Sequence, residues 1–188
     1  MEQAPQLATE RLLLRPFRRT DGVRVEQLAG VREVADTTLT IPHPYPTGGG
    51  AQWIATHADA WERRENLALA ICTATPSSEL VGAINLRLSL AHRHGEIGYW
   101  IAVASWGHGF ATEAARAVVG YGFAELGLHR VEGRHFTRNP ASGRVLQKLG
   151  MRLEGVHRDA YYRWDAFEDV AVYAVLASEW RGGSSTTL

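Results

Sequence analysis

Hydrophobic residues follow two different spacings along the chain. Short apolar runs, which are typical of strands, occur at 11–17, 66–74, 80–90 and 95–103. The turn-rich segments "TPSSE" and "AHRH" separate the last three runs, and this predicts an antiparallel meander. Later runs predict three more strands, at 129–137, 151–162 and 165–180.

Apolar residues at a spacing of three to four predict the helices. These are expected from Thr20 and Asp21 to about Gly30, in a short stretch after it, and over 51–64, 109–127 and 139–150. The segment Ile41–Gly50, "IPHPYPTGGG", alternates prolines and then stacks glycines, so it predicts a loop. This order of elements predicts a single α/β (α+β) domain over residues 1–180, with a mixed, mostly antiparallel sheet flanked by helices. A flexible tail is expected at 181–188.

The composition is that of an ordinary globular protein and indicates no charged partner. The 188 residues are 45% hydrophobic, and 20 Lys and Arg balance 20 Asp and Glu. This balance gives no basic footprint for nucleic acid or an anionic membrane. The sequence holds one cysteine, Cys72, which excludes an intrachain disulfide. Because the first ten residues lack the regions of a secretory signal and no apolar run reaches about 18–20 residues, we expect a cytoplasmic protein.

A glycine-rich turn, "SWGHGFATEAA" at 105–115, stands between a predicted strand and a predicted helix. Such a turn presents free backbone N–H groups at the positive end of the helix dipole, which suits a phosphate. Gly107 and Gly109 allow close approach of a ligand, and Thr112 adds a hydroxyl. Two alternatives stay open on these residues: a tight connection without a ligand, and a dinucleotide site. Against the dinucleotide site, Glu132 falls inside a strand rather than at its end.

The segment Gly95–Gly155 is similar to the core of the GNAT N-acetyltransferases. Within that superfamily it resembles the ribosomal-protein N-terminal acetyltransferases of the RimJ/RimL type. The stretches "TERLLLRPF", "IPHPYP" and "LVGAINLRL" fit the same family in the same order, so the resemblance extends from about Thr9 to Trp180. It implies a sheet splayed at the cofactor site and an acetyltransferase that uses acetyl-CoA as co-substrate. The acceptor it implies is a primary amine, either a protein N-terminal α-amine or a small-molecule amine.

The resemblance also implies where acetyl-CoA binds. The CoA pyrophosphate is expected at the glycine turn, where Trp106 replaces the Gln or Arg of the family motif, and the pantetheine is expected along the backbone of 100–103. Asn139, which is also a good helix N-cap, is expected to contact the ligand. The expected cofactor-binding residues are Trp100, Ile101, Ala102, Val103, Trp106, Gly107, His108, Gly109, Phe110, Ala111, Thr112, Asn139 and Ser142.

Two residues are expected to take part in catalysis. Ser142 matches the family's serine beside the CoA sulfur, and it is the expected acid or thiolate donor. Glu96 resembles the acidic residue that many relatives use as a base, and its alternative is a solvated carboxylate at the start of a strand. Tyr45, Trp53 and Tyr161 are expected to border the acceptor pocket, although a core position would also explain Trp53.

Other classes of protein fit the sequence less well. His92, His94 and Glu96 alternate as strand ligands of a metal would, but "AHRHG" is typical of a turn, so no metal is expected. The remaining alternatives are a non-catalytic acyl-CoA-binding module and a nicotinamide-cofactor enzyme. The expected partners are acetyl-CoA and an amine, and no nucleic acid or membrane partner is expected. Because relatives are often dimers, a homodimer is a further expectation.

Overall fold

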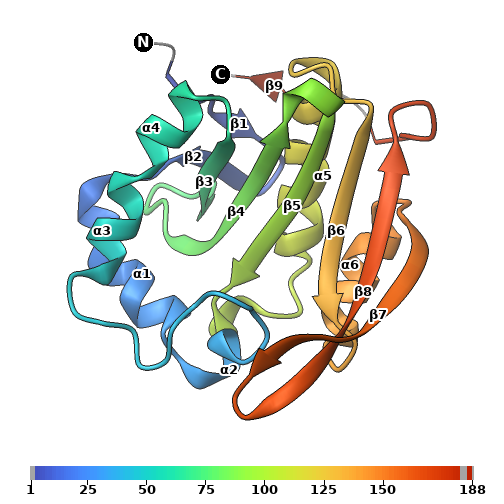
Figure 1. The fold of residues 1–188 in the computed structure, drawn as a ribbon. Coiled ribbons are helices and arrows are strands. Elements are labelled where there is room, and N and C mark those ends of the chain that lie inside the picture. The colour runs from blue at the N-terminus through green and yellow to red at the C-terminus, as the bar shows by residue number, and fades with distance from the viewer. Residues whose placement is uncertain (1–2, 183–185, 188) are drawn as a thin grey trace.

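The structure, a computed structural model, describes residues 3–182 and 186–187. Its strands form one nine-stranded sheet in the order β7-β8-β6-β5-β4-β3-β2-β1-β9 (Figure 1). The strands are β1 (Leu7–Ala8), β2 (Leu12–Pro16), β3 (Asn66–Thr73), β4 (Leu80–Ser89), β5 (His94–Ile101), β6 (Arg130–Phe136), β7 (Arg152–Arg163), β8 (Ala166–Leu176) and β9 (Thr186–Thr187).

The pairing of the strands confirms the mixed, mostly antiparallel sheet. β3, β4 and β5 form the expected antiparallel meander. β5 and β6 run parallel, and theirs is the one parallel pair among the described strands. A dinucleotide-binding fold needs a series of parallel strands joined by helices. The topology therefore gives no support to the nicotinamide alternative.

Helices cover both faces of the sheet. They are α1 (Gly22–Ala29), α2 (Arg32–Ala35), α3 (Gly49–Ala55), α4 (His57–Glu62), α5 (Phe110–Ala124) and α6 (Pro140–Lys148). Side chains alternate along a strand, so Ile97, Tyr99 and Ile101 of β5 share one face, which we call the α5 face. There, Ile97 and Ile101 pack in one buried cluster with residues of α5 and α6, and Figure 1 shows both helices behind the sheet.

The opposite face of β5, which we call the α1 face, carries Glu96, Gly98 and Trp100. Trp100 is buried in a second cluster with Val25 of α1, Val34 of α2 and Ile54 of α3. The sheet therefore has two separate buried layers: α5 and α6 pack on one face and α1, α2 and α3 on the other, while Trp61 of α4 belongs to the cluster of the α5 face.

The prediction of one helix over 51–64 is wrong. The chain forms α3 and α4, which meet at Thr56. The Thr56 hydroxyl donates to the carbonyl oxygen of Trp53 at 2.8 Å, and its backbone N–H donates to the same oxygen at 3.2 Å. These bonds close a tighter turn than an α-helix and end α3, because a threonine can satisfy the backbone locally.

The flexible tail expected at 181–188 stays a prediction. Residues 183–185 and 188 lie outside the described residues, and Thr186–Thr187 form β9 beside β1. The domain bounds at 1–180 and the homodimer stay predictions as well.

Candidate active site

β5 and β6 separate after a short paired segment. Their register runs from His94 opposite Arg130 to Ile97 opposite Gly133, yet β5 continues to Ile101 and β6 to Phe136. β4 and β8 hold the outer edges of these strands to their ends. The expected splay is present, and Figure 1 shows the two strands diverging. Within the described sheet, it leaves the β6-facing edge of β5 without a strand partner after Ile97.

The glycine turn follows β5 at the open end of the splay. Gly107 and Gly109 both have φ +79°, a left-handed backbone conformation that favours glycine, and Gly109 is the N-cap of α5. A Cβ on Gly107 would meet nothing within 4 Å. Across the part of the chain that the structure describes, the backbone N–H groups of residues 107–112 have no protein acceptor. The turn thus offers open space lined by unpaired donors at a helix N-terminus, which suits an anion.

Two long side chains hold this turn in place. The Trp106 indole N–H donates to the carbonyl oxygen of Ile101 at 2.7 Å, which ties the turn to the end of β5. Arg11 donates to the carbonyl oxygen of His108 at 3.0 Å and forms an ion pair of 2.5 Å with Glu113 in the first turn of α5. The tryptophan that departs from the family motif therefore has a structural role here.

The ion pair of Arg11 with Glu113 was not foreseen from the sequence. Burial raises the pKa of the Glu113 carboxyl, but hydrogen bonds from Thr9 and Arg11 outweigh it, and the net pKa is lowered. An ionised Glu113 also suits the positive end of the helix dipole. No local signal could have found this pair, because about a hundred residues separate its members in the chain.

On the α5 face, Ser142 of α6 contacts β5 through Tyr99. The Tyr99 hydroxyl lies 2.9 Å from Ser142 Oγ and 3.3 Å from the Ser142 carbonyl oxygen. Burial raises the pKa of Tyr99 to about 12, although the hydrogen bond to Ser142 acts against the shift. The Asn139 side chain accepts from the Ser142 N–H at 3.3 Å, which is its N-cap role. Sequence reasoning missed Tyr99, although strand alternation puts its hydroxyl on an otherwise apolar face.

On the α1 face, Glu96 lies in a network of charged side chains. Its carboxylate is 3.6 Å from Arg87 and 3.8 Å from Arg134. Arg134 also pairs with Glu132 at 2.7 Å, and Glu132 is 5% exposed. Because β5 and β6 are in register here, Glu96 lies directly opposite Glu132, and Arg134 pairs with both carboxylates. The network stands where the strands are still paired, next to the start of the splay.

Glu132 is the centre of this network. Burial raises the pKa of its carboxyl, but hydrogen bonds from Arg134 and Arg130 outweigh burial, and the net pKa is lowered. Arg130 also donates two hydrogen bonds to Glu154, at 2.6 and 2.5 Å. Negative and positive groups therefore compensate one another on the α1 face.

Two of the three expected pocket residues, Tyr45 and Trp53, pack against the buried cluster of Trp100. Tyr45 packs between two glycines: a Cβ on Gly30 would lie 2.7 Å from its Cβ, and one on Gly49 would lie 3.2 Å from its ring. Trp53 packs edge-on against Phe17 and His57, with ring centroids 5.1 and 4.4 Å away, which is a packing role.

Tyr161 lies beside the network instead. It belongs to β7, and its side chain helps to raise the pKa of Arg134 after the larger effect of Glu132. Of the three expected residues, Tyr161 is the one whose contacts lead to Glu96.

α2 bridges the splay on the α1 face. Its Val34 belongs to the buried cluster of Trp100, at the end of β5, while Asp36 pairs with Arg138, just beyond the end of β6, at 3.0 Å. Arg163 at the end of β7 donates to the backbone carbonyl groups around α2, namely those of Ala35, Leu39 and Ile41. These contacts tie α2 to the ends of β5, β6 and β7 on this face.

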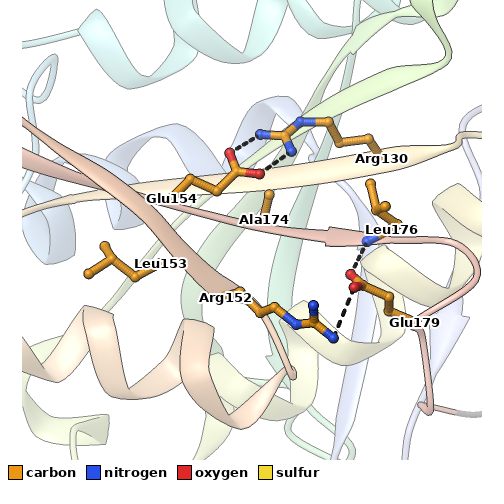
Figure 2. Close-up of a pocket in the computed structure, with 7 residues that line it drawn as sticks. All are labelled: Arg130, Arg152, Leu153, Glu154, Ala174, Leu176 and Glu179. Carbon is orange, nitrogen blue, oxygen red and sulfur yellow. Dashed lines mark hydrogen bonds and ion pairs between the residues drawn. The ribbon is translucent and has the colours of Figure 1, made fainter.

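A cavity of about 390 Å³ lies elsewhere. It is lined by Arg130, Arg152, Leu153, Glu154, Ala174, Leu176 and Glu179. Figure 2 shows that each of its two guanidinium groups points at a carboxylate of the same lining, Arg130 at Glu154 and Arg152 at Glu179. Arg130 opens β6, whereas the glycine turn follows the other end of the parallel β5, so this cavity and the turn lie at opposite ends of the strand pair.

Comparison with known proteins identifies the family. Residues 11–152 match the model of the acetyltransferase (GNAT) domain. The chain belongs to the GNAT acetyltransferase family. It is 31% identical to the uncharacterized N-acetyltransferase YoaA of Bacillus subtilis, over 92% of this chain and 97% of the relative. It is therefore an N-acetyltransferase, and acetyl-CoA is its acetyl donor.

Two further GNAT proteins extend the comparison. The ribosomal-protein-serine acetyltransferase of Escherichia coli is 34% identical over 51% of this chain and 54% of that relative, which confirms the expected likeness to ribosomal-protein acetyltransferases. The solved structure of a GNAT-family acetyltransferase from Bacillus anthracis superposes with a TM-score of 0.82 at 26% identity, over 93% of this chain and 99% of that one.

Two further properties concern the part of the chain that the structure describes. No helix in it is long and apolar enough to cross a membrane. It also holds no group of three or more His, Cys, Asp or Glu side chains that could bind a metal ion.

Proposed function

We propose that residues 107–112 bind the pyrophosphate of acetyl-CoA and that this acetyltransferase acts on protein N-terminal α-amines. The observation that carries the cofactor site is the set of unpaired backbone N–H groups at the start of α5, facing open space at Gly107. A pyrophosphate supplies the acceptors that these donors lack, and the helix dipole adds to the attraction. The residues present therefore fit the cofactor.

The edge of β5 continues this site toward the splay. The backbone of residues 100–103 leads from the unpaired part of β5 to the turn, and it would hold the pantetheine by hydrogen bonds of the kind that a neighbouring strand makes. Bound in this way, acetyl-CoA supplies a thioester whose carbonyl carbon is open to attack by an amine.

Two side chains, one on each face of the sheet, handle the two protons of the transfer. Ser142 on the α5 face donates a hydrogen bond to the cofactor sulfur, which gains negative charge as its bond to carbon breaks. Glu96 on the α1 face receives, through water, the proton that the amine nitrogen loses when its bond to carbon forms. One proton leaves nitrogen and one is finally taken up by sulfur, so the transfer needs no covalent enzyme intermediate.

The charges near Glu96 favour an α-amine over a strongly basic acceptor. Arg87 and Arg134 already balance the Glu96 carboxylate, so this face offers little net attraction to a polyamine or a lysine ammonium. An α-amine with a pKa near 8 is about 10% neutral at pH 7, whereas a lysine is neutral to less than about 0.1%. A terminal amine therefore needs little help from a base that is neutralised by arginines, and the likeness to a ribosomal-protein-serine acetyltransferase supports the same acceptor.

Matched peptides test the choice of acceptor. Initial rates are measured with acetyl-CoA and a hexapeptide that begins with serine, has a free N-terminus and lacks lysine. The control hexapeptide has a blocked N-terminus and one internal lysine, and spermidine is the third acceptor. We expect turnover with the first peptide at a rate at least about tenfold above either other acceptor. Faster turnover of spermidine or of the lysine peptide would overturn the proposed acceptor, while acetyl-CoA binding without turnover would favour a binding module.

A further inference from the structure

The first turn of α6 is seated between the two splayed strands. Tyr99 of β5 reaches Ser142 at 2.9 Å, and the next residue, Gly143, lies over His135 of β6. A Cβ on Gly143 would be 2.8 Å from His135 Nε2, so the backbone of this turn lies in close contact with a side chain of β6. The Ser142 backbone N–H is satisfied by Asn139. The position of the Ser142 side chain is therefore set by contacts with both strands.

The hydroxyl groups of Tyr99 and Ser142 each carry one proton, and the direction of the hydrogen bond between them decides whether Ser142 can donate to a ligand. If Ser142 donates to Tyr99, its proton is used inside the protein, and the Tyr99 proton goes to the Ser142 carbonyl oxygen at 3.3 Å. If Tyr99 donates to Ser142 Oγ, the serine proton is free for an outside acceptor. A sulfur that gains negative charge selects the second arrangement, because each hydrogen bond of such a chain strengthens the next.

We propose that Tyr99 is a positioning residue that acts through Ser142: its phenol donates to Ser142 Oγ and so directs the serine proton to the cofactor sulfur. This inference rests on the proposed role of Ser142. Tyr99 is well suited to donate, since its buried phenol stays protonated throughout the neutral range, with a pKa of about 12. Tyr99 neither touches the cofactor nor gives up its proton in this scheme. It differs from Ser142 in that its whole effect depends on the serine being present.

A double-mutant cycle tests this dependence. The proteins are the wild type, Tyr99→Phe, Ser142→Ala and the double variant, with Tyr173→Phe as the matched control. Tyr173 is a buried tyrosine of β8 whose hydroxyl also contacts α6, accepting from Gln147 at 3.3 Å. Circular dichroism and thermal unfolding confirm that each variant is folded. The first measurement needs no acceptor: calorimetric binding of CoA and of desulfo-CoA at pH 9, where a larger share of the thiol is ionised than at pH 7.

The wild type and the control are expected to bind CoA about tenfold more tightly than desulfo-CoA at pH 9. Tyr99→Phe and Ser142→Ala each lose most of this preference, and the double variant loses no more than Ser142→Ala. In turnover of the serine-initiated hexapeptide, Ser142→Ala lowers kcat at least about tenfold with little change in CoA affinity, and Tyr99→Phe lowers kcat severalfold, with KM for acetyl-CoA unchanged. Tyr99→Phe in the Ser142→Ala background changes nothing further.

Three results would overturn the inference. If Tyr99→Phe keeps the wild-type preference for CoA over desulfo-CoA and the wild-type kcat, Ser142 does not need the phenol, and the proposed function still stands. Additive losses in the double variant mean that Tyr99 acts on its own. A Ser142→Ala protein with wild-type behaviour removes the serine role itself, and intact acetyl-CoA binding by that variant then separates this failure from a failure of the cofactor site.

Discussion

Two helices bridge the splay between β5 and β6, one on each face, and they do so by different chemistry. On the α5 face, the first turn of α6 contacts Tyr99 of β5 through a hydrogen bond and His135 of β6 through close packing. On the α1 face, α2 packs in the buried cluster of Trp100 and pairs with Arg138 beyond β6. The first bridge uses a hydroxyl pair and close packing at short range, and the second depends in part on long charged side chains.

We propose that the two bridges have different roles in the reaction. On the α6 bridge, a carbon added at Gly143 would be 2.8 Å from the His135 ring, and this close packing helps to hold the neighbouring serine hydroxyl in position. The Arg138–Asp36 pair of the α2 bridge is more than a third exposed on both sides, so water screens it and its side chains can adapt. We therefore place the group that acts on the sulfur on the rigid bridge and the fit to the acceptor on the adaptable one.

The largest effect is expected on acetyl-CoA binding, from a substitution in the glycine turn before α5. Gly109→Val puts a branched side chain next to the unpaired N–H groups and should weaken acetyl-CoA binding at least about a hundredfold, as measured by calorimetry. Gly127→Val is the matched control, because Gly127 also has positive φ, at +61°, with open space around it, and follows α5 instead of preceding it. Both variants lose stability through backbone strain. Equal loss of acetyl-CoA binding in the two would refute the proposed pyrophosphate site.

The second effect is on the charge balance of the α1 face. Glu132→Gln leaves Arg130 and Arg134 partly uncompensated beside a buried position and should lower the free energy of unfolding at pH 7 by about 3 kcal/mol. Glu65→Gln, which removes an exposed partner of Arg63, is the control and should cost less than about 1 kcal/mol. Denaturant unfolding measures both values. Equal costs would mean that the network adds no more than a surface pair.

The same residue predicts a pH dependence. The pKa of Glu132 is lowered from its ordinary 4.5 in the folded state, since hydrogen bonds from the arginines outweigh burial. Its ionised form therefore stabilises the fold above about pH 4.5, and this contribution is lost as the pH falls below that value through the folded pKa. The thermal midpoint of the wild type should fall more steeply between pH 5 and about pH 3 than that of Glu132→Gln. Parallel curves would contradict this assignment.

A smaller effect, on kcat/KM, is expected from a substitution of the proposed base, Glu96. Glu96→Gln should lower kcat/KM for the serine-initiated hexapeptide about fivefold at pH 7, and the loss should shrink toward pH 9, where more of the amine is already neutral. Glu154→Gln, a carboxylate of the same network that pairs with Arg130, is the control and should leave the rate unchanged. A loss that persists at pH 9 would assign Glu96 to acceptor binding instead of proton transfer.

The smallest effect tests the adaptable bridge. Arg138→Ala removes the contacts with Asp36 and Glu168 and should raise KM for the hexapeptide about threefold, with kcat and acetyl-CoA affinity unchanged. Its cost in stability should exceed the about 1 kcal/mol of an exposed pair, because the Glu168 side chain is 11% exposed and loses its partner. A fall in kcat with unchanged KM would show that the two bridges do not divide the work in this way.

The features that depend on residues close together in the chain could be predicted from the sequence. The meander, the mixed sheet and the glycine-rich turn between a strand and a helix all follow from apolar spacing and turn residues close together in the chain. Motif resemblance led to Ser142, and the structure shows its side chain beside the splay. The wrong helix over 51–64 is a local error, since a threonine bond that ends a helix does not disturb the apolar spacing on either side of it.

The parts that were missed depend on register and on distant contacts. Tyr99 meets Ser142 because β5 and α6 pack together across 43 residues of chain, which spacing within β5 cannot reveal. The network of Glu96 exists because β6 places Glu132 opposite it. The contacts of Trp53 with Phe17, which precedes it by 36 residues, are likewise not visible in the apolar spacing of its own helix, and its place at the acceptor pocket stays a prediction.

Amide hydrogen exchange with and without acetyl-CoA tests the central claim most directly. The unpaired N–H groups of residues 107–112 should exchange quickly in the free protein, because no protein acceptor protects them. Acetyl-CoA at saturating concentration should slow exchange in this segment, while the segment around Arg152 and Glu154 at the cavity should not change. If acetyl-CoA binds by calorimetry but residues 107–112 exchange as fast as before, the glycine turn is not the cofactor site and the account is wrong.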